Sequence, residues 1–157
     1  KNYSGKFYGP VPLRIGIEQS RNLMTIRLAT DVGMKVISDY AERFGVYSKM
    51  NSFLAGSLGS QETTLYKMVS SYAMFANGGE RVTPTLVDRV QDRFGRNIYK
   101  HDKRLCVNCE KDTLEVGKSP HIKSNRERVL DPLTAFRLQS MMRGVVERGT
   151  AKSVAIK

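Results

Sequence analysis

Apolar residues in this chain recur with the period of an α-helix over several segments, and this pattern restricts the fold more than any other feature. In the clearest segment the apolar residues fall at i, i+1, i+4, i+5 and i+8: Val36, Ile37, Tyr40, Ala41 and Phe44. That spacing places them on one face of a helix. A glycine follows at position 45, where glycine often ends a helix. The sequence therefore predicts an amphipathic helix over residues 36–44.

Two further segments carry the same period. The segment 63–76 predicts a helix, with Glu62 expected as its cap, and the residues expected on its buried face are Leu65, Met68, Val69, Tyr72, Phe75 and Ala76. Asp131 and Pro132 are the usual N-cap and first residue of a helix. That last helix is expected to end at Gly149 and to bury Leu138, Met141, Met142 and Val145.

The period changes between these two helices. Residues 86–90 and 97–100 are rich in β-branched and aromatic side chains and flank a glycine turn at 92–96, which predicts a β-hairpin. Residues 103–127 have little periodicity and are expected to form an irregular loop. At 157 residues the chain has the length of about one domain. The predicted fold class is α+β, mostly helical with a β-hairpin.

A Ser-x-Asn tripeptide, Ser20-Arg21-Asn22, lies between two short helical segments, 12–18 and 23–30. Serine and asparagine are ordinary helix caps, and Asn22 could cap the second of these helices. The same tripeptide places a hydroxyl and a carboxamide side by side at the corner between the two helices. Taken alone it indicates no more than a cap, but the residues around it indicate a further role.

Those flanking residues resemble the transpeptidase domain of bifunctional class A penicillin-binding proteins. The resemblance covers most of the chain except the middle, and runs through NYSGKFYGPVPLRIGIEQSRNLMTIRLA, GSLGSQETTLYKMVSSYAMFANGG, PTLVDRV and GVVERGTAKSV. The family has three signatures, S-x-x-K, S-D-N and K-T-G, and this sequence contains the second alone, as Ser-Arg-Asn. The resemblance implies that residues 1–157 form part of the serine β-lactamase and penicillin-binding transpeptidase fold.

The resemblance also assigns roles to residues. Ser20 is expected to be catalytic as a proton relay between the lysines of the other two motifs, and Asn22 to be catalytic and substrate-binding, as a donor to the amide carbonyl of a stem peptide. Arg21 is expected to point away, toward the surface. Residues 60–64 match a family segment that supports the cleft from outside, and residues 148–150 match a stretch that leads toward the K-T-G strand.

The partners that the resemblance implies are peptidoglycan stem peptides, β-lactams and the rest of a longer parent polypeptide. The parent would lie at the periplasmic face of a bacterial inner membrane, anchored through an N-terminal part that is missing here. No cofactor and no metal are expected. Because neither lysine motif occurs in the sequence, this chain alone is expected to be inactive.

The sequence has two cysteines, Cys106 and Cys109, in a C-x-x-C arrangement. A disulfide is favoured if the parent domain faces the oxidising periplasm. A zinc site would need four ligands, and the available set is His101, Cys106, Cys109 and His121, without a second paired knuckle. A thioredoxin-type pair would need a strand before the motif and a helix after it, which the sequence does not predict. Of the three, we expect the disulfide between Cys106 and Cys109.

The formal net charge is +11, from 26 basic and 15 acidic residues. Such an excess attracts polyanions, but the basic residues are scattered singly rather than clustered with stacking aromatics. We interpret them as a solvated surface and expect no nucleic-acid partner. Two alternatives to a transpeptidase stay open: a non-catalytic scaffold or interaction module, and a basic nucleic-acid-binding domain with a helix-turn-helix at residues 15–30.

Overall fold

The computed structural model describes residues 5–109, 113, 116–117 and 119–155. Parts of the expected loop 103–127 lie outside these residues. The chain divides into two compact units, Lys1–Val82 with Arg128–Lys157, and Thr83–Glu127. Among the described residues no helix is both long enough and apolar enough to cross a membrane.

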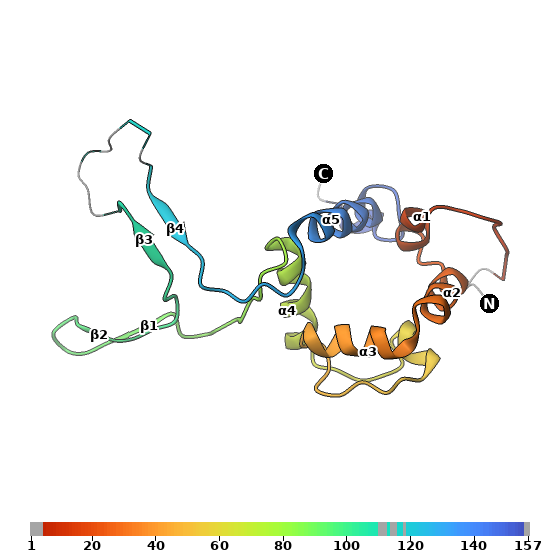
Figure 1. Ribbon diagram of the computed structural model, residues 1–157, viewed down its shortest axis with the longest axis horizontal. Helices are drawn as coiled ribbons and strands as arrows, with labels where there is room; N and C mark the ends of the chain where they lie inside the picture. Colours follow the sequence, from red (N-terminus) through yellow and green to blue (C-terminus); the bar gives the residue numbers. More distant parts are fainter. Residues whose placement is uncertain (1–4, 110–112, 114–115, 118, 156–157) are drawn as a thin grey trace. The chain divides into compact units, whose positions relative to one another are not determined.

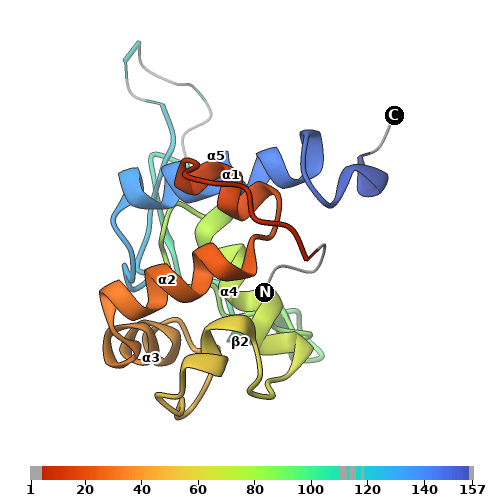
Figure 2. The same cartoon turned by 90° about the vertical axis from the view of Figure 1, so that its right-hand side faces the viewer.

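The first unit is helical. Its elements are α1 (Leu13–Glu18), α2 (Asn22–Val32), α3 (Met34–Arg43), the 3₁₀ helix η1 (Leu54–Leu58), α4 (Leu65–Ala76), α5 (Pro132–Glu147) and the 3₁₀ helix η2 (Lys152–Val154). The five α-helices follow one another around a circuit that brings α1 beside α5, although these two helices lie at opposite ends of the sequence (Figures 1 and 2). The helices predicted from the apolar period are therefore confirmed.

The helix ends follow local backbone rules. Gly33, with φ of 89°, separates α2 from α3, and Gly45, with φ of 75°, follows the end of α3 as predicted. The Asp131 carboxylate accepts from the Thr134 amide at 2.9 Å, which confirms Asp131 as the cap of α5 and lowers the pKa of its carboxyl. The expectation for α4 was wrong: the cap is Thr64, which accepts from the Lys67 amide, and not Glu62.

The buried face of α4 also differs from the expectation. Met74 and Ser71 are its buried residues, whereas Leu65 is 80% exposed and Val69 and Tyr72 are about half exposed. Met74 belongs to a core that also contains Ala29, Met50, Val129 and Ala135. The face of α4 that packs against α5 is therefore narrow, and most of its apolar stripe is left uncovered by the described residues.

The second unit consists of two antiparallel strand pairs. The predicted hairpin is confirmed as β1 (Arg89–Gln91) paired with β2 (Asn97–Lys100), with an irregularity between Val90 and Gln91. The Asp92 carboxylate closes its turn by accepting from the amides of Phe94 and Arg96.

The second pair lies within residues 103–127, where the sequence predicts an irregular loop. It joins β3 (Leu105–Val107) to β4 (His121–Lys123), with Cys106 opposite Ile122. Three-residue strands are too short to show an alternating pattern, so local periodicity does not reveal them.

Candidate functional site

Ser20 lies directly after α1, in a left-handed backbone conformation with φ of 50°. The Ser20 amide donates to the Ile17 carbonyl at 3.1 Å, and the Arg21 amide donates to the Gly16 carbonyl at 2.9 Å. These two bonds form a Schellman motif, in which the left-handed residue is usually glycine and sometimes asparagine. A residue with a Cβ atom is disfavoured there by about 1–2 kcal/mol. Ser20 therefore occupies the corner at a conformational cost, and its side chain is exposed.

Asn22 is the first residue of α2 and is half-buried. The N-cap position belongs to Arg21, and no side chain caps this helix. The expectation that Asn22 caps α2 was therefore wrong, because the Schellman turn places the helix start one residue earlier than the sequence suggests. The Asn22 carboxamide is not engaged as a cap.

Arg21 was expected to point away, toward the surface, but its side chain packs against Tyr8 instead. Its guanidinium carbon lies 3.2 Å from the ring centre of Tyr8, and its Nε atom is buried without a hydrogen-bond partner among the described residues. Tyr8 belongs to the segment that precedes α1, and this segment passes close to α2. Between this segment and α2 lies a groove of about 550 Å³, lined in part by Phe7, Leu13, Arg21 and Leu28. Neither Ser20 nor Asn22 lines this groove.

Glu18, two residues before Ser20, is a buried residue that is 1% exposed and forms ion pairs beside the corner. Arg148 donates to both of its carboxylate oxygens, with Nη2 2.5 Å from Oε1 and Nε 3.2 Å from Oε2. A second guanidinium, that of Arg14, lies 3.6 Å from Oε1. The hydrogen bond from Arg148 is the largest influence that lowers the pKa of Glu18, against the opposing effect of burial, and the two positive charges add to it. Glu18 is thus an ionised carboxylate.

The main chain before Ser20 is bonded to the segment that follows α5. The Thr150 amide donates to the Glu18 carbonyl at 3.1 Å, and Gln19 Nε2 donates to the Arg148 carbonyl at 3.3 Å. The structure therefore brings two family-like segments together, Ser-Arg-Asn and Arg-Gly-Thr. Sequence reasoning singled out both segments but missed the residue that joins them, because a carboxylate on a short helix gives no signal that it is buried.

Residues 60–64 lie away from this corner in the sequence and organise their own loop. The Gln61 side chain accepts from the Asn51 amide at 2.9 Å and donates to the Lys49 carbonyl at 2.7 Å. The Thr63 hydroxyl donates to the Val46 carbonyl at 2.5 Å. These bonds hold the loop between α3 and α4, and the expected role of this segment in supporting the cleft stays a prediction.

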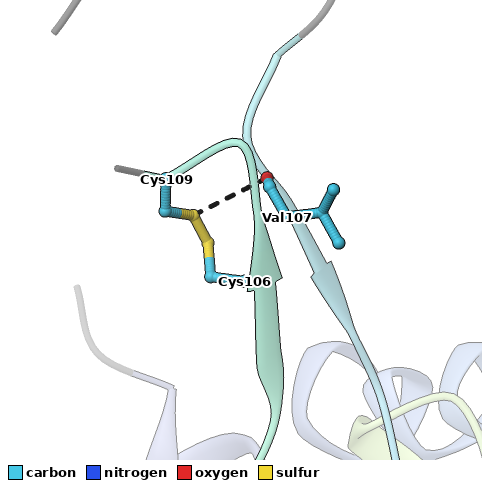
Figure 3. Close-up of a disulfide and its surroundings, with 3 residues drawn as sticks. All are labelled: Cys106, Val107 and Cys109. Atoms are coloured by element: carbon cyan, nitrogen blue, oxygen red, sulfur yellow. Dashed lines mark hydrogen bonds between the residues drawn. A yellow bond between two sulfur atoms is a disulfide. The ribbon is translucent and has the colours of Figure 1, made fainter. Parts of the chain in front are cut away.

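Cys106 and Cys109 are joined as a disulfide in the structure, with their Cα atoms 5.7 Å apart (Figure 3). Cys109 Sγ lies 3.8 Å from the carbonyl oxygen of Val107. The four residues of the alternative zinc set all lie within the described part of the chain, and no group of three or more His, Cys, Asp or Glu in that part could hold a metal ion. The bond between the two cysteines stays a prediction for the protein in solution.

The sequence matches one family model and several curated proteins, which agree with one another. A family model described as "Penicillin binding protein transpeptidase domain" matches residues 1–157. The chain is 40% identical over 155 residues to penicillin-binding protein 1A of Rickettsia bellii, covering 98% of the chain and 20% of the relative. It is 31% identical over 156 residues to penicillin-binding protein 1A of Neisseria gonorrhoeae, covering 99% of the chain and 18% of the relative. The chain thus spans about a fifth of the length of these curated relatives.

Solved structures match over the whole fold. The crystal structure of penicillin-binding protein 1A from Haemophilus influenzae superposes with a TM-score of 0.79 at 26% identity, over 100% of this chain and 26% of that one. A D,D-transpeptidase domain from Eggerthella lenta superposes with a TM-score of 0.68 at 20% identity, over 99% of this chain and 41% of that one. These likenesses confirm the predicted α+β fold class.

Proposed function

Because the chain belongs to the penicillin-binding protein transpeptidase family, we propose that residues 1–157 are part of a peptidoglycan D,D-transpeptidase and supply one side of its active site. The substrates of the whole protein would be the stem peptides of peptidoglycan, and β-lactams would acylate it as mimics of those peptides. Its place would be the periplasmic face of the bacterial inner membrane. The remaining motifs of the site, S-x-x-K and K-T-G, would come from the rest of the parent polypeptide.

The observation that carries this proposal is the left-handed conformation of Ser20. A helix end that served only the fold would be more stable with glycine at this position. A strained, exposed side chain in a sparsely populated backbone region is a common feature of functional sites. The backbone cost at Ser20 is therefore explained if its hydroxyl group is needed.

A serine hydroxyl has the chemistry that the role requires. Acyl transfer needs a nucleophile, a base, a route for the proton to the leaving group and donors for the developing oxyanion. The Ser20 hydroxyl both donates and accepts a hydrogen bond, so it can pass a proton between two neighbouring amines. We assign it this relay between the lysines of the two motifs that this sequence lacks.

The Asn22 carboxamide supplies a different function. An amide side chain offers two N–H donors and one acceptor oxygen. Because no helix cap engages it, we assign it as the donor to the amide carbonyl of the bound stem peptide. This residue would hold the substrate, while Ser20 would move the proton.

Replacing Ser20 by glycine separates catalysis from stability. In the natural-length protein, Ser20→Gly removes the hydroxyl group but relieves the left-handed backbone, so the free energy of unfolding should stay unchanged or rise by about 1 kcal/mol. The rate of acylation by a fluorescent penicillin should fall by about 10²–10⁴, the usual contribution of proton transfer by a side chain. Quenched time courses resolved on denaturing gels measure the acylation rate, and unfolding curves measure the free energy of unfolding.

The matched control is Ser57→Ala. The Ser57 hydroxyl donates to the Leu54 carbonyl within η1 at 2.7 Å, far from the corner in the sequence, and its loss should leave acylation unchanged. A Ser20→Gly protein that is labelled at the wild-type rate would contradict the relay role. A wild-type protein that forms no adduct would contradict the proposed activity itself.

A further inference from the structure

Residues immediately before Ser20 are tied to the segment after α5 by side-chain and main-chain bonds together. Arg148 donates from Nη2 to Glu18 Oε1 at 2.5 Å and from Nε to Glu18 Oε2 at 3.2 Å. The Thr150 amide donates to the Glu18 carbonyl, and the Gln19 side chain donates to the Arg148 carbonyl. Glu18 and Gln19 lie inside the Schellman turn, whose hydrogen bonds span Gly16 to Arg21. The position of Ser20 therefore depends on contacts with a segment about 130 residues away.

Two glycines make this close approach sterically possible. A Cβ atom on Gly144 would overlap the Glu18 carboxylate, and a Cβ atom on Gly149 would overlap the Glu18 carbonyl oxygen. Gly144 lies inside α5, where glycine is less favourable than alanine by about 1 kcal/mol. The sequence therefore has a poor helix former in α5 at the position where the Glu18 carboxylate packs, and only glycine leaves room for that contact.

A second cation, Arg14, lies 3.6 Å from the same carboxylate oxygen, Oε1, that Arg148 Nη2 contacts. Arg14, one helical turn before Glu18, is itself held on α5, because its guanidinium donates to the Ser140 carbonyl at 3.0 Å and to the Ser140 hydroxyl at 3.1 Å. Both cations that contact the buried carboxylate are therefore attached to α5 or to the residue that directly follows it. Glu18 is buried and the Arg148 side chain is half exposed. An ion pair that includes a buried charge is weak evidence for stability, and the best attested use of buried pairs is to specify one arrangement.

We propose that Glu18 and Arg148 are positioning residues for the Ser20 hydroxyl in the transpeptidation reaction. The ion pair holds the last turn of α1 in register with the segment 148–150, and the Schellman turn transmits that register to Ser20. Neither side chain touches the substrate in this role. The inference rests on the proposed function, since it gives Ser20 the proton relay assigned above.

The test uses the natural-length protein and the variants Glu18→Gln and Arg148→Lys. Each keeps hydrogen-bonding capacity but loses the two-point ion pair. The rate constant of the covalent step with fluorescent penicillin should fall about 10–100-fold, as expected when a reacting group is misplaced by about 1 Å. The penicillin concentration that gives half the maximal rate should change little, because substrate binding is not removed.

The matched control is Lys35→Gln on α3. It breaks an exposed ion pair in which Lys35 Nζ lies 3.1 Å from Asp39 Oδ2, and it should leave acylation unchanged. Circular dichroism at the assay temperature establishes that each variant is folded before its rate is compared. Wild-type rates in folded Glu18→Gln and Arg148→Lys proteins would overturn the inference.

A double-substitution cycle distinguishes positioning from general damage. If Glu18 acts through Ser20, then Glu18→Gln in a Ser20→Gly background should slow the residual acylation less than about twofold, because the group it positions is gone. The same fold-loss in both backgrounds would overturn the inference while leaving the proposed function intact. A wild-type protein without any adduct would instead refute the proposed function, and the inference with it.

Discussion

Glu18 and Arg148 stand 130 residues apart in the sequence, yet Arg148 Nη2 lies 2.5 Å and Nε 3.2 Å from the two Glu18 carboxylate oxygens. Because Glu18 is 1% exposed, its ionisation is linked to folding. The groups that face it are the guanidinium groups of Arg14 and Arg148, and Glu147 in turn contacts Arg148. This arrangement makes the first helix sensitive to acid.

The linkage has a definite sign. The Arg148 hydrogen bond lowers the pKa of Glu18 in the folded protein, so the unfolded chain binds a proton first as the pH falls below about 4.3. The stability that ionised Glu18 contributes is present above that pH and is lost as the pH falls through the lowered pKa. The difference in unfolding free energy between wild type and Glu18→Gln should therefore be constant near neutrality and shrink in acid. Urea titrations at several pH values measure it, and a difference that persists unchanged to about pH 3 would contradict the linkage.

Met74 should contribute far more to stability than the exposed apolar residues of α4, such as Leu65. It is 1% exposed, so Met74→Ala should lower the free energy of unfolding by about 2–5 kcal/mol. Leu65, in the first turn of the same helix, is 80% exposed, and Leu65→Ala should change it by less than about 0.5 kcal/mol. Chemical denaturation of both variants decides the matter, and equal losses would mean that the face predicted from the sequence is the buried one.

Cys106 and Cys109 should be joined in protein made under oxidising conditions. The ring they close is very short, so the bond should stabilise the fold by less than the roughly 3 kcal/mol expected for a 15-residue loop. Reduction should loosen residues 103–127 without unfolding the helices around Ser20. Thiol titration in denaturant measures the bond, and two free thiols in oxidised material would refute it.

Metal analysis tests the alternative for the same loop. No bound zinc is expected. One zinc per chain that is lost in His101→Ala or His121→Ala would favour the four-ligand site over the disulfide.

The 157-residue chain by itself should not be acylated by penicillin. Its sequence contains neither Ser-x-x-Lys nor Lys-Thr-Gly, so it lacks the nucleophile and the oxyanion strand that the family uses. Incubation with a fluorescent penicillin followed by intact mass measures any adduct. A stoichiometric covalent adduct on any serine would overturn the assignment of roles at the corner.

Local sequence signals were sufficient for the α-helices and the first hairpin and for some of their ends, but not for the β3–β4 pair or for the caps of α2 and α4. The apolar period of residues 36–44 predicts α3, Asp131 and Pro132 predict the start of α5, and the glycine turn at 92–96 predicts the hairpin. Each of these signals acts within a few residues, through side-chain spacing, capping or backbone freedom. The Ser-Arg-Asn motif could be found in the same way, because it depends on residue identity alone.

Tertiary structure decided what surrounds that motif. The period of α4 did not indicate which of its residues would be buried. Met74 lies outside the predicted face and is buried, whereas Leu65 belongs to that face and is 80% exposed. The burial of Glu18 depends on Arg148 and on two glycines near the far end of the chain. The sequence by itself determined which segments are α-helices, because side-chain spacing is local, whereas the environment of Ser20 required long-range packing that no local pattern encodes.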